Sequence, residues 1–318
     1  MECSWVIRAG RMPDAAGLPS QRAKSGFSPS GVDCLFSDSP AQQTLAGEIE
    51  LAGVGVHSGQ PTRLRLLPAE ADRGLRFRRI DLPGAPEFPA TLDYIVPSEI
   101  GRRTTLGLDE TARVGTVEHL LAVCLGLGLD NAILELDGPE VPILDGSAEP
   151  LARACLERGF VSLDRPRRWI ELQRPVVYDC YPVQIVALPS PTLRATYFVE
   201  FNNAMFRMQA AHFEITPESF RSELAPARTF CFEHEIESLR AAGLIRGGDL
   251  TCAVVIGQDR ILGGPLRFPD ELVRHKVVDL LGDICLLGRP LHAHVSAWRA
   301  GHAWHIEFLK MLKEAIVL

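Results

Sequence analysis

No stretch of this 318-residue chain is apolar enough for a membrane-spanning helix, which needs about 18 consecutive uncharged residues. The longest apolar candidates are interrupted by Asp130 in one case and by Pro182 and Pro189 in another. We therefore expect a soluble protein without a transmembrane segment.

The cysteines lack the spacing of a disulfide framework or of a thiolate zinc site. The chain has eight cysteines and no CxxC pair. Several lie inside apolar runs such as LLAVCLGLGL (120–129). Buried, reduced cysteines are typical of cytosolic proteins, so we expect core thiols and a cytoplasmic location.

An excess of positive charge is also absent. The chain carries 33 Lys and Arg against 40 Asp and Glu, which gives a net charge of −7 and a pI of about 5.8. This balance provides no general attraction for nucleic acid, which we exclude as a partner. A hydrophobic content of 46% over this length is enough for the cores of two domains.

The first 41 residues lack the periodicity of a helix or strand. Positions 1–40 contain seven Ser, four Gly and four Pro. This composition predicts a disordered N-terminal extension over residues 1–41. The alternatives are an organellar targeting segment, which its acidic residues oppose, and a gene start placed too far upstream.

Strand and helix patterns follow from Gln42 onward. In residues 42–167, alternating segments such as QQTLAGEIELAG and TRLRLLPA precede a helical pattern at 116–127, for which Thr116 is the expected N-cap, and a second one at 150–160. Residues 168–318 again run from strands to helices. The order predicts two α+β domains, 42–167 and 168–318.

One helical segment carries an unusual polar stripe. In RHKVVDLLGDICLLG (274–288), His275, Asp279 and Asp283 recur every four residues and share one helix face. Such spacing is most often the solvated stripe of an amphipathic helix. The apolar neighbours leave little room for a wide polar face here, however, so the stripe is expected to point into a site where an imidazole and a carboxylate could bind a metal.

Two histidines elsewhere could complete such a site. His119 follows Glu118 at a helix start, and a glutamate beside a ligand histidine can accept a proton from metal-bound water. His302 follows Gly301 at a predicted strand-to-helix turn, where it could act as a general acid oriented by Asp283. Taken singly, these residues are better explained as a capped helix start and an ordinary turn histidine.

Other histidine groups have the spacing of metal pairs. They are HAH at 292–294 and HAWH at 302–305. His292 and His294 share one strand face and suit a solvent-lining role. HEIES at 234–238 lacks the second histidine of a zincin motif and is rejected.

Seven segments, in order, resemble the zinc-dependent UDP-3-O-acyl-N-acetylglucosamine deacetylases of lipid A biosynthesis. They are GVGVHSG (53–59), TVEHLLA (116–122), GLDNAILELDGPEVPILDGSA (128–148), ARTFCF (227–232), GLIRGG (243–248), LRFPDELVRHKVVDLLGD (266–283) and RAGH (299–302). Together they span the chain from about residue 42 to its end.

The resemblance implies a fold and a set of catalytic roles. Two α+β domains of similar layered sheet-and-helix architecture would hold the active site between them. One zinc ion would be bound by His119, His275 and Asp279, with Glu118 as general base, His302 as general acid and Asp283 supporting His302. The enzyme would be an amidohydrolase that removes the N-acetyl group as acetate.

The resemblance also implies how the substrate is bound. Lys276 would contact the anionic UDP portion, while Thr229 and Phe230 would lie at the reacting centre and near the acyl chain. A hydrophobic passage for that chain is expected around RTFCFEHEIESLRAAGLIRGG (228–248) in the second domain. The expected partner is this small-molecule lipid precursor, and the expected oligomeric state is a monomer.

Departures from the family pattern concern substrate contacts. FNNAM stands at 201–205 in place of an FNHP-like turn, Arg299 replaces a common lysine, and Asp249 replaces a common serine. His57 has no assigned role beyond lining the site. Two rival hypotheses are a two-metal phosphoesterase, which would need further bridging carboxylates, and a non-catalytic binding protein with structural zinc.

Overall fold

The computed structural model describes residues 40–317. The predicted disordered extension therefore lies, apart from its last two residues, outside the described residues. Ala41 already begins the first strand, β1 (Ala41–Leu45), which pairs antiparallel with β9 (Phe160–Pro166).

The first half of the chain is built on a five-stranded sheet with the order β2-β3-β8-β4-β5. Its strands are β2 (Ile49–Val54), β3 (Pro61–Pro68), β4 (Leu75–Arg79), β5 (Glu87–Pro89) and β8 (Ala132–Leu136). Neighbours are antiparallel except for β4 and β8. Alternation in β3 buries Leu64 and Leu66 and leaves Arg63 exposed, so one face of the sheet packs on the core.

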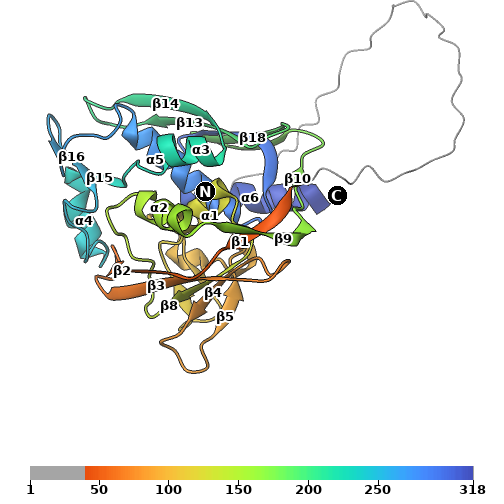
Figure 1. The fold of residues 1–318 in the computed structure, drawn as a ribbon. Coiled ribbons are helices and arrows are strands. Elements are labelled where there is room, and N and C mark those ends of the chain that lie inside the picture. Colours follow the sequence, from red (N-terminus) through yellow and green to blue (C-terminus); the bar gives the residue numbers. More distant parts are fainter. Residues whose placement is uncertain (1–39, 318) are drawn as a thin grey trace, which may run out of the picture. The chain divides into compact units, whose positions relative to one another are not determined.

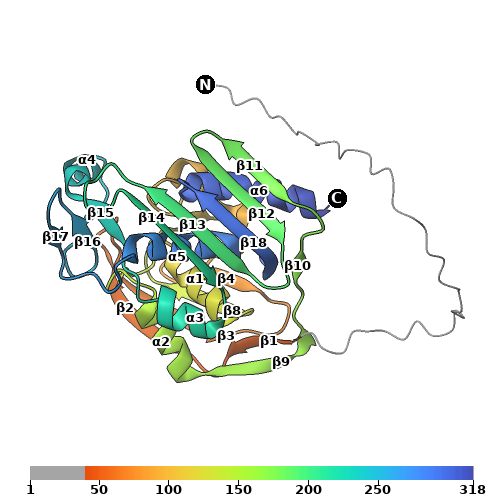
Figure 2. The ribbon, with the colours of Figure 1, turned by 90° about the horizontal axis from the view of Figure 1, so that it is seen from above.

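The second half is built on a larger sheet with the path β11-β12-β18-β13-β14, and β10 pairs with β18 off this path. The strands are β10 (Ile170–Glu171), β11 (Val176–Cys180), β12 (Val183–Pro189), β13 (Arg194–Glu200), β14 (Met208–Glu214) and β18 (Leu291–Trp298). The central strand β18 is the last in the sequence. Figure 2 shows it between β12 and β13.

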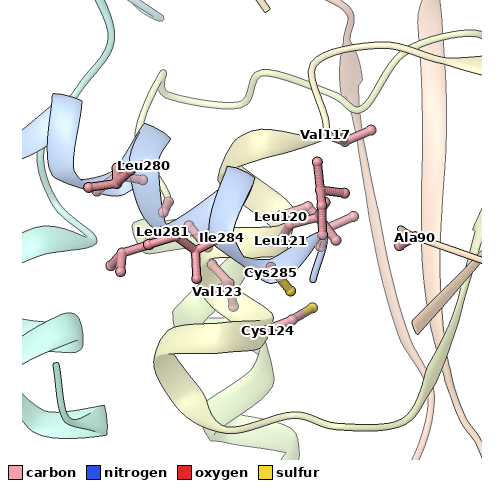
Figure 3. Packing of buried hydrophobic residues seen from close by; sticks show 14 of the residues in the cluster. Ala90, Val117, Leu120, Leu121, Val123, Cys124, Leu280, Leu281, Ile284 and Cys285 are labelled. Carbon is pink, nitrogen blue, oxygen red and sulfur yellow. The ribbon is translucent and has the colours of Figure 1, made fainter. Parts of the chain in front are cut away.

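Two helices, α1 (Glu118–Leu127) and α5 (Glu271–Cys285), lie between the two sheets (Figure 1). Figure 3 shows Leu120 and Leu121 of α1 beside Leu281 and Ile284 of α5 in the hydrophobic core. The helices approach closely because residue 282 is glycine: a Cβ there would meet the Glu118 carbonyl oxygen at 2.1 Å.

The remaining elements surround this centre. They are α2 (Glu149–Arg158), the short α3 (Pro217–Ser219) continued by one π-helical turn (Phe220–Leu224), α4 (Ile236–Ala241), α6 (His302–Val317), the small sheet β15 (Phe230–Phe232), β16 (Val254–Ile256) and β17 (Ile261–Leu262), the pair β6 (Leu106–Gly107) and β7 (Arg113–Val114), and 3-10 turns at Leu92–Tyr94, Pro97–Glu99 and Glu233–Glu235. Within residues 40–317, no helix combines the length and the apolar character that crossing a membrane requires.

The predicted α+β class is confirmed, but the predicted N-cap of α1 is wrong. Thr116 lies two residues before the helix with a backbone φ of 56°, and α1 begins without a side-chain cap. The Thr116 hydroxyl instead donates to Oε1 of the fully buried Glu140 at 2.6 Å. This bond directs the Thr116 side chain to Glu140, and no side chain caps the first turn of α1.

Candidate metal and acid–base site

Three side chains from α1 and α5 converge in the layer between the sheets. His119 lies in the first turn of α1, and His275 and Asp279 lie one turn apart on α5. Asp279 Oδ1 is 3.4 Å from His275 Nε2 and 3.9 Å from His119 Nε2. All three ligand atoms lie within 4.8 Å of one another and are buried.

The arrangement of these atoms fits a tetrahedral metal ion. Zinc ligands at the usual bond lengths lie about 3.3 Å apart, close to the separations observed. His275 Nδ1 donates to the Ala227 carbonyl at 3.0 Å, which leaves Nε2 free to bind a metal. Lys276 Nζ donates to Asp279 Oδ2 at 2.6 Å, which leaves Oδ1 for the same purpose.

The protonation states of the three groups also suit a metal. Burial, with a smaller effect of the neighbouring His275 imidazole, lowers the pKa of His119 to about 3. Burial lowers the pKa of His275 as well. Burial alone would raise the pKa of Asp279, but Lys276 and the surrounding imidazoles hold it well below its usual value. The site therefore offers two neutral imidazoles and a carboxylate, the donor set that zinc prefers.

Glu118 lies beside this cluster at the start of α1. Burial raises the pKa of its carboxyl to about 7 against the opposing charge of His302. The backbone N–H of Thr104 donates to Glu118 Oε2 at 3.0 Å and fixes the orientation of the carboxylate. A carboxylate with a pKa near 7 is suited to accept a proton in one step and return it in the next.

His302 approaches the cluster from the first residue of α6. Its Nε2 is 3.8 Å from Asp279 Oδ2, and its Nδ1 is 2.7 Å from Asp283 Oδ2. Burial alone would lower the pKa of His302, but the carboxylates of Asp283 and Asp279 raise it to about 9. The imidazole is therefore charged at neutral pH and can donate a proton.

The predicted substrate residues lie around the same cluster. Lys276 contacts Asp279, as described above. Phe230 begins β15, and its ring centroid lies 6.2 Å from that of His275. Thr229, the preceding residue, donates its backbone N–H to the Gly146 carbonyl at 2.8 Å and so connects this loop to the first half of the chain.

His57 lies in the turn that follows β2. It lines a cavity of about 370 Å³ together with Arg103, Glu140 and Arg246, among other residues. Burial lowers its pKa to about 4, and its Nδ1 accepts from the Ile245 backbone N–H at 3.4 Å. Backbone hydrogen bonds from Arg246 to the His57 carbonyl and from Gly247 to the Val56 carbonyl hold this turn against residues 245–247.

The other predicted histidine pairs are not in the three-ligand cluster. His294 shares Thr196 with His212 on the second sheet, and His292 stacks on Trp169. His302 and His305 both contact Asp283 Oδ2, at 2.7 and 2.8 Å. These separations match hydrogen bonds and are shorter than the roughly 3.3 Å expected between two ligands of one zinc ion. Asp283, His302 and His305 thus form a second group whose ligand atoms lie within 4.8 Å of one another, but their hydrogen bonds account for its spacing.

Sequence reasoning missed Thr104 and Tyr197, and it did not predict the contact of His305 with Asp283. Thr104 hydrogen-bonds Glu118 through its backbone and, through its hydroxyl, Asp283 Oδ1 at 2.6 Å. His305 joins Asp283 to the Tyr197 hydroxyl. Strand alternation could have placed Tyr197 inside the core, and helical spacing could have placed His305 beside His302. Nothing in the sequence indicates that both meet Asp283.

The chain is similar to known proteins over most of its length. Residues 42–314 match the family model described as UDP-3-O-acyl N-acetylglycosamine deacetylase. Proteins named UDP-3-O-acyl-N-acetylglucosamine deacetylase are similar over most of the chain. One from Thermosynechococcus vestitus is 41% identical over 273 residues (86% of this chain, 94% of that protein). One from Nostoc is 42% identical over 276 residues (85% and 98%), and one from Cellvibrio japonicus is 39% identical over 278 residues (86% and 90%).

Proposed function

Because the chain belongs to the UDP-3-O-acyl N-acetylglycosamine deacetylase family, we propose that it hydrolyses the acetamide of UDP-3-O-acyl-N-acetylglucosamine to acetate and the free amine. The observation that carries this proposal is the convergence of a buried base, a charged imidazole and a three-ligand cluster. Glu118 and His302 flank the cluster formed by His119, His275 and Asp279.

We propose that this cluster holds a single zinc ion. His119 and His275 would bind through Nε2, and Asp279 through Oδ1. When bound, zinc supplies electrophilic polarisation of the acetamide carbonyl and of the attacking water. The neutral imidazoles and the ionised carboxylate support this assignment, since each already has its metal-binding protonation state.

Glu118 acts as the general base. Its carboxylate accepts a proton from the water whose oxygen attacks the acetamide carbon. The Thr104 N–H holds the carboxylate in one orientation, so the side chain need not rotate before proton transfer. Burial, which raises the pKa of Glu118 to about 7, makes it a stronger base than an exposed glutamate.

His302 acts as the general acid. As the C–N bond breaks, its Nε2 donates a proton to the leaving amine nitrogen. Asp283 accepts from Nδ1 at 2.7 Å, which favours the charged imidazole before the transfer and fixes its orientation. The two proton-handling groups thus begin the reaction in the forms their tasks require, one ionised carboxylate and one charged imidazole.

We propose further that the substrate binds through Lys276, Thr229 and Phe230. Lys276 would meet the anionic UDP portion near Asp279, and Phe230 would contact the acyl chain. An apolar cluster beside Phe230 supports a passage for that chain; it contains Val254, Ile256 and Leu272 with Phe201, Phe206, Phe232, Ile261 and Leu266 packed against it. Apolar area of this kind favours a hydrocarbon ligand over water.

The family membership and the composition support proposals about the pathway, the location and the assembly of the protein. We propose a step of lipid A biosynthesis, a cytoplasmic location, a monomer, and two domains that divide between residues 167 and 168. The chain passes at this point from β9, paired with β1, to β10, paired with β18.

Acetate release from the UDP-linked substrate, followed by mass spectrometry with and without a chelator, tests the activity. We expect turnover that stops on metal removal and returns with zinc. Turnover that is unchanged after complete metal removal, verified by elemental analysis, would contradict the metal assignment. A zinc-loaded, folded protein that releases no acetate would contradict the activity itself.

A further inference from the structure

A second histidine on α6 shares the carboxylate that supports His302. His305 follows His302 by one turn, so both imidazoles project from the same face of the helix. His305 Nδ1 lies 2.8 Å from Asp283 Oδ2, the same oxygen that His302 Nδ1 meets at 2.7 Å. On its other side, His305 Nε2 lies 2.9 Å from the hydroxyl of Tyr197 on β13. Tyr197, His305 and Asp283 are fully buried.

The hydrogen bonds of this group determine where its protons lie. An ionised carboxylate only accepts hydrogen bonds, so Nδ1 of His305 carries the proton that it donates to Asp283. Burial lowers the pKa of His305, which makes the imidazole neutral and leaves Nε2 as an acceptor. Tyr197 must then donate its hydroxyl proton to Nε2, and burial, which raises its pKa, keeps that proton in place.

Three donors therefore hold the Asp283 carboxylate. His302 and His305 donate to Oδ2, and the Thr104 hydroxyl donates to Oδ1 at 2.6 Å. Because Asp283 is fully buried, a lost donor is not replaced by bulk water. Each donor limits the rotation of the carboxylate and thus the direction in which His302 Nε2 points.

We propose that His305 is a positioning residue for the deacetylation: held by Tyr197, it fixes the Asp283 carboxylate that orients the proton donor His302. The proposal rests on the proposed function, in which His302 protonates the leaving amine. His305 itself touches neither the metal cluster nor, through any described contact, the reacting atoms. Its contribution is therefore to the rate of the chemical step and not to substrate binding.

Kinetics of paired variants test this role. In His305→Leu the donor to Asp283 is lost, and we expect kcat to fall roughly 10- to 100-fold, the worth of one hydrogen bond to a charged group. His305→Asn keeps an N–H near the position of Nδ1, and its kcat should stay within about 3-fold of the wild type. KM and zinc content should not change in either variant. His212→Leu, on an exposed part of β14, is the matched control and should leave kcat unchanged.

A double-mutant cycle separates positioning from general damage. Tyr197→Phe alone should lower kcat by about 2- to 10-fold, but it should have no further effect in the His305→Leu background, because the pair acts on Asp283 as one unit. The proposal would be overturned if His305→Leu had the kcat of the wild type, or if the Leu and Asn variants lost kcat equally. Additive effects of Tyr197→Phe and His305→Leu on kcat would also overturn it. If His305→Leu does not fold, the Asn and Tyr197→Phe variants decide the question.

The tautomer of His305 gives a readout that does not depend on turnover. Long-range ¹H–¹⁵N NMR of the zinc-loaded wild type should show a neutral His305 protonated at Nδ1, and the signal should persist in His212→Leu. A charged imidazole, or protonation at Nε2, would overturn the proposal. A wild type that releases no acetate would defeat the proposed function, while the NMR result would still decide the placement of His305.

Discussion

The pKa values of Glu118 and His302 are both raised, but the causes differ. Burial raises the pKa of Glu118 to about 7, although the charge of His302 opposes this shift, and the Asp279 carboxylate adds to it. His302 faces the carboxylates of Asp283 and Asp279, which outweigh burial and raise its pKa to about 9. Each residue thereby has a pKa suited to its proposed step.

Replacing His302 tests the assignment of the acid. In His302→Ala we expect turnover to fall roughly 10²- to 10⁴-fold, since general acid catalysis contributes about this much. Zinc content should be retained, because the three ligands are elsewhere. Kinetics and elemental analysis provide the measurement, with His212→Ala as control. Turnover like that of the wild type would remove His302 from the role of acid.

Glu271, another buried carboxylate, forms an ion pair with Arg228, and the contribution of this pair to stability depends on pH. It accepts from Arg228 Nε at 2.8 Å and from the Arg267 backbone N–H at 2.6 Å. Burial alone would raise the pKa of Glu271, but these donors lower it below its usual value of 4.5. Its stabilisation should therefore be fully present above about pH 4.5 and be lost as the pH falls through the lowered pKa.

Glu271→Gln tests that contribution. At pH 7 the variant should lose roughly 3–5 kcal/mol of unfolding free energy, because Arg228 is left buried without its partner. Since the wild type loses the same interaction in acid, the difference between the two proteins should shrink below about pH 4.5. Denaturant unfolding across pH measures this, with Glu307→Gln on the exposed face of α6 as control. A difference independent of pH would contradict the ion pair as its cause.

The sequence could predict contacts between site residues that are close along the chain, but not contacts between residues that are far apart. His275 and Asp279 share a helix, so their spacing indicated a common face. The link between Thr104 and Asp283 crosses 179 residues and depends on how the two halves pack. No local pattern contains that information.

At the scale of elements, the site depends on the close approach of α1 and α5. The helix positions were predicted from their periodicity, but the start of α1 was not. Thr116 has the residue type of an N-cap, yet a buried acceptor contributed by Glu140, 24 residues later, takes its hydroxyl. Capping preferences describe local hydrogen bonds and fail where a tertiary contact orients the side chain differently.

Gly282→Ala tests the importance of this approach. The added Cβ would lie 2.1 Å from the Glu118 carbonyl oxygen, so α1 and α5 must separate. We expect a loss of about 1–3 kcal/mol of stability, as for other overpacked cores, together with reduced zinc affinity and turnover. Gly101→Ala, where a Cβ meets nothing within 4 Å, is the control. Denaturant unfolding and zinc titration measure both effects; unchanged values would show that the helices tolerate the displacement.

At the scale of the molecule, the candidate metal site connects the two halves of the chain. His119 comes from the first half, and His275 and Asp279 come from the second. Zinc bound here should therefore stabilise the packing of α1 against α5 as well as promote the reaction. Composition and element order predicted the α+β class, but the packing that joins these ligands comes only from the folded core.

Removing the metal should lower the melting temperature. A ligand that binds only the folded state at 100 times its dissociation constant adds about 2.7 kcal/mol of stability. We expect a chelator to lower Tm of the wild type, measured by calorimetry, and to have little effect on His119→Ala, which lacks one ligand. An equal shift in both proteins would indicate a chelator effect unrelated to this site.

The central place of β18 affects how the protein can be made. On the ribosome the chain emerges from its N-terminus, so β12 and β13 are synthesised about 100 residues before the strand that fills the space between them. Until then both have unpaired edges, which are prone to associate with other chains. His302 follows β18 by only four residues. The nascent protein therefore gains its complete second sheet and its proposed proton donor together, once residues 291–302 have been made.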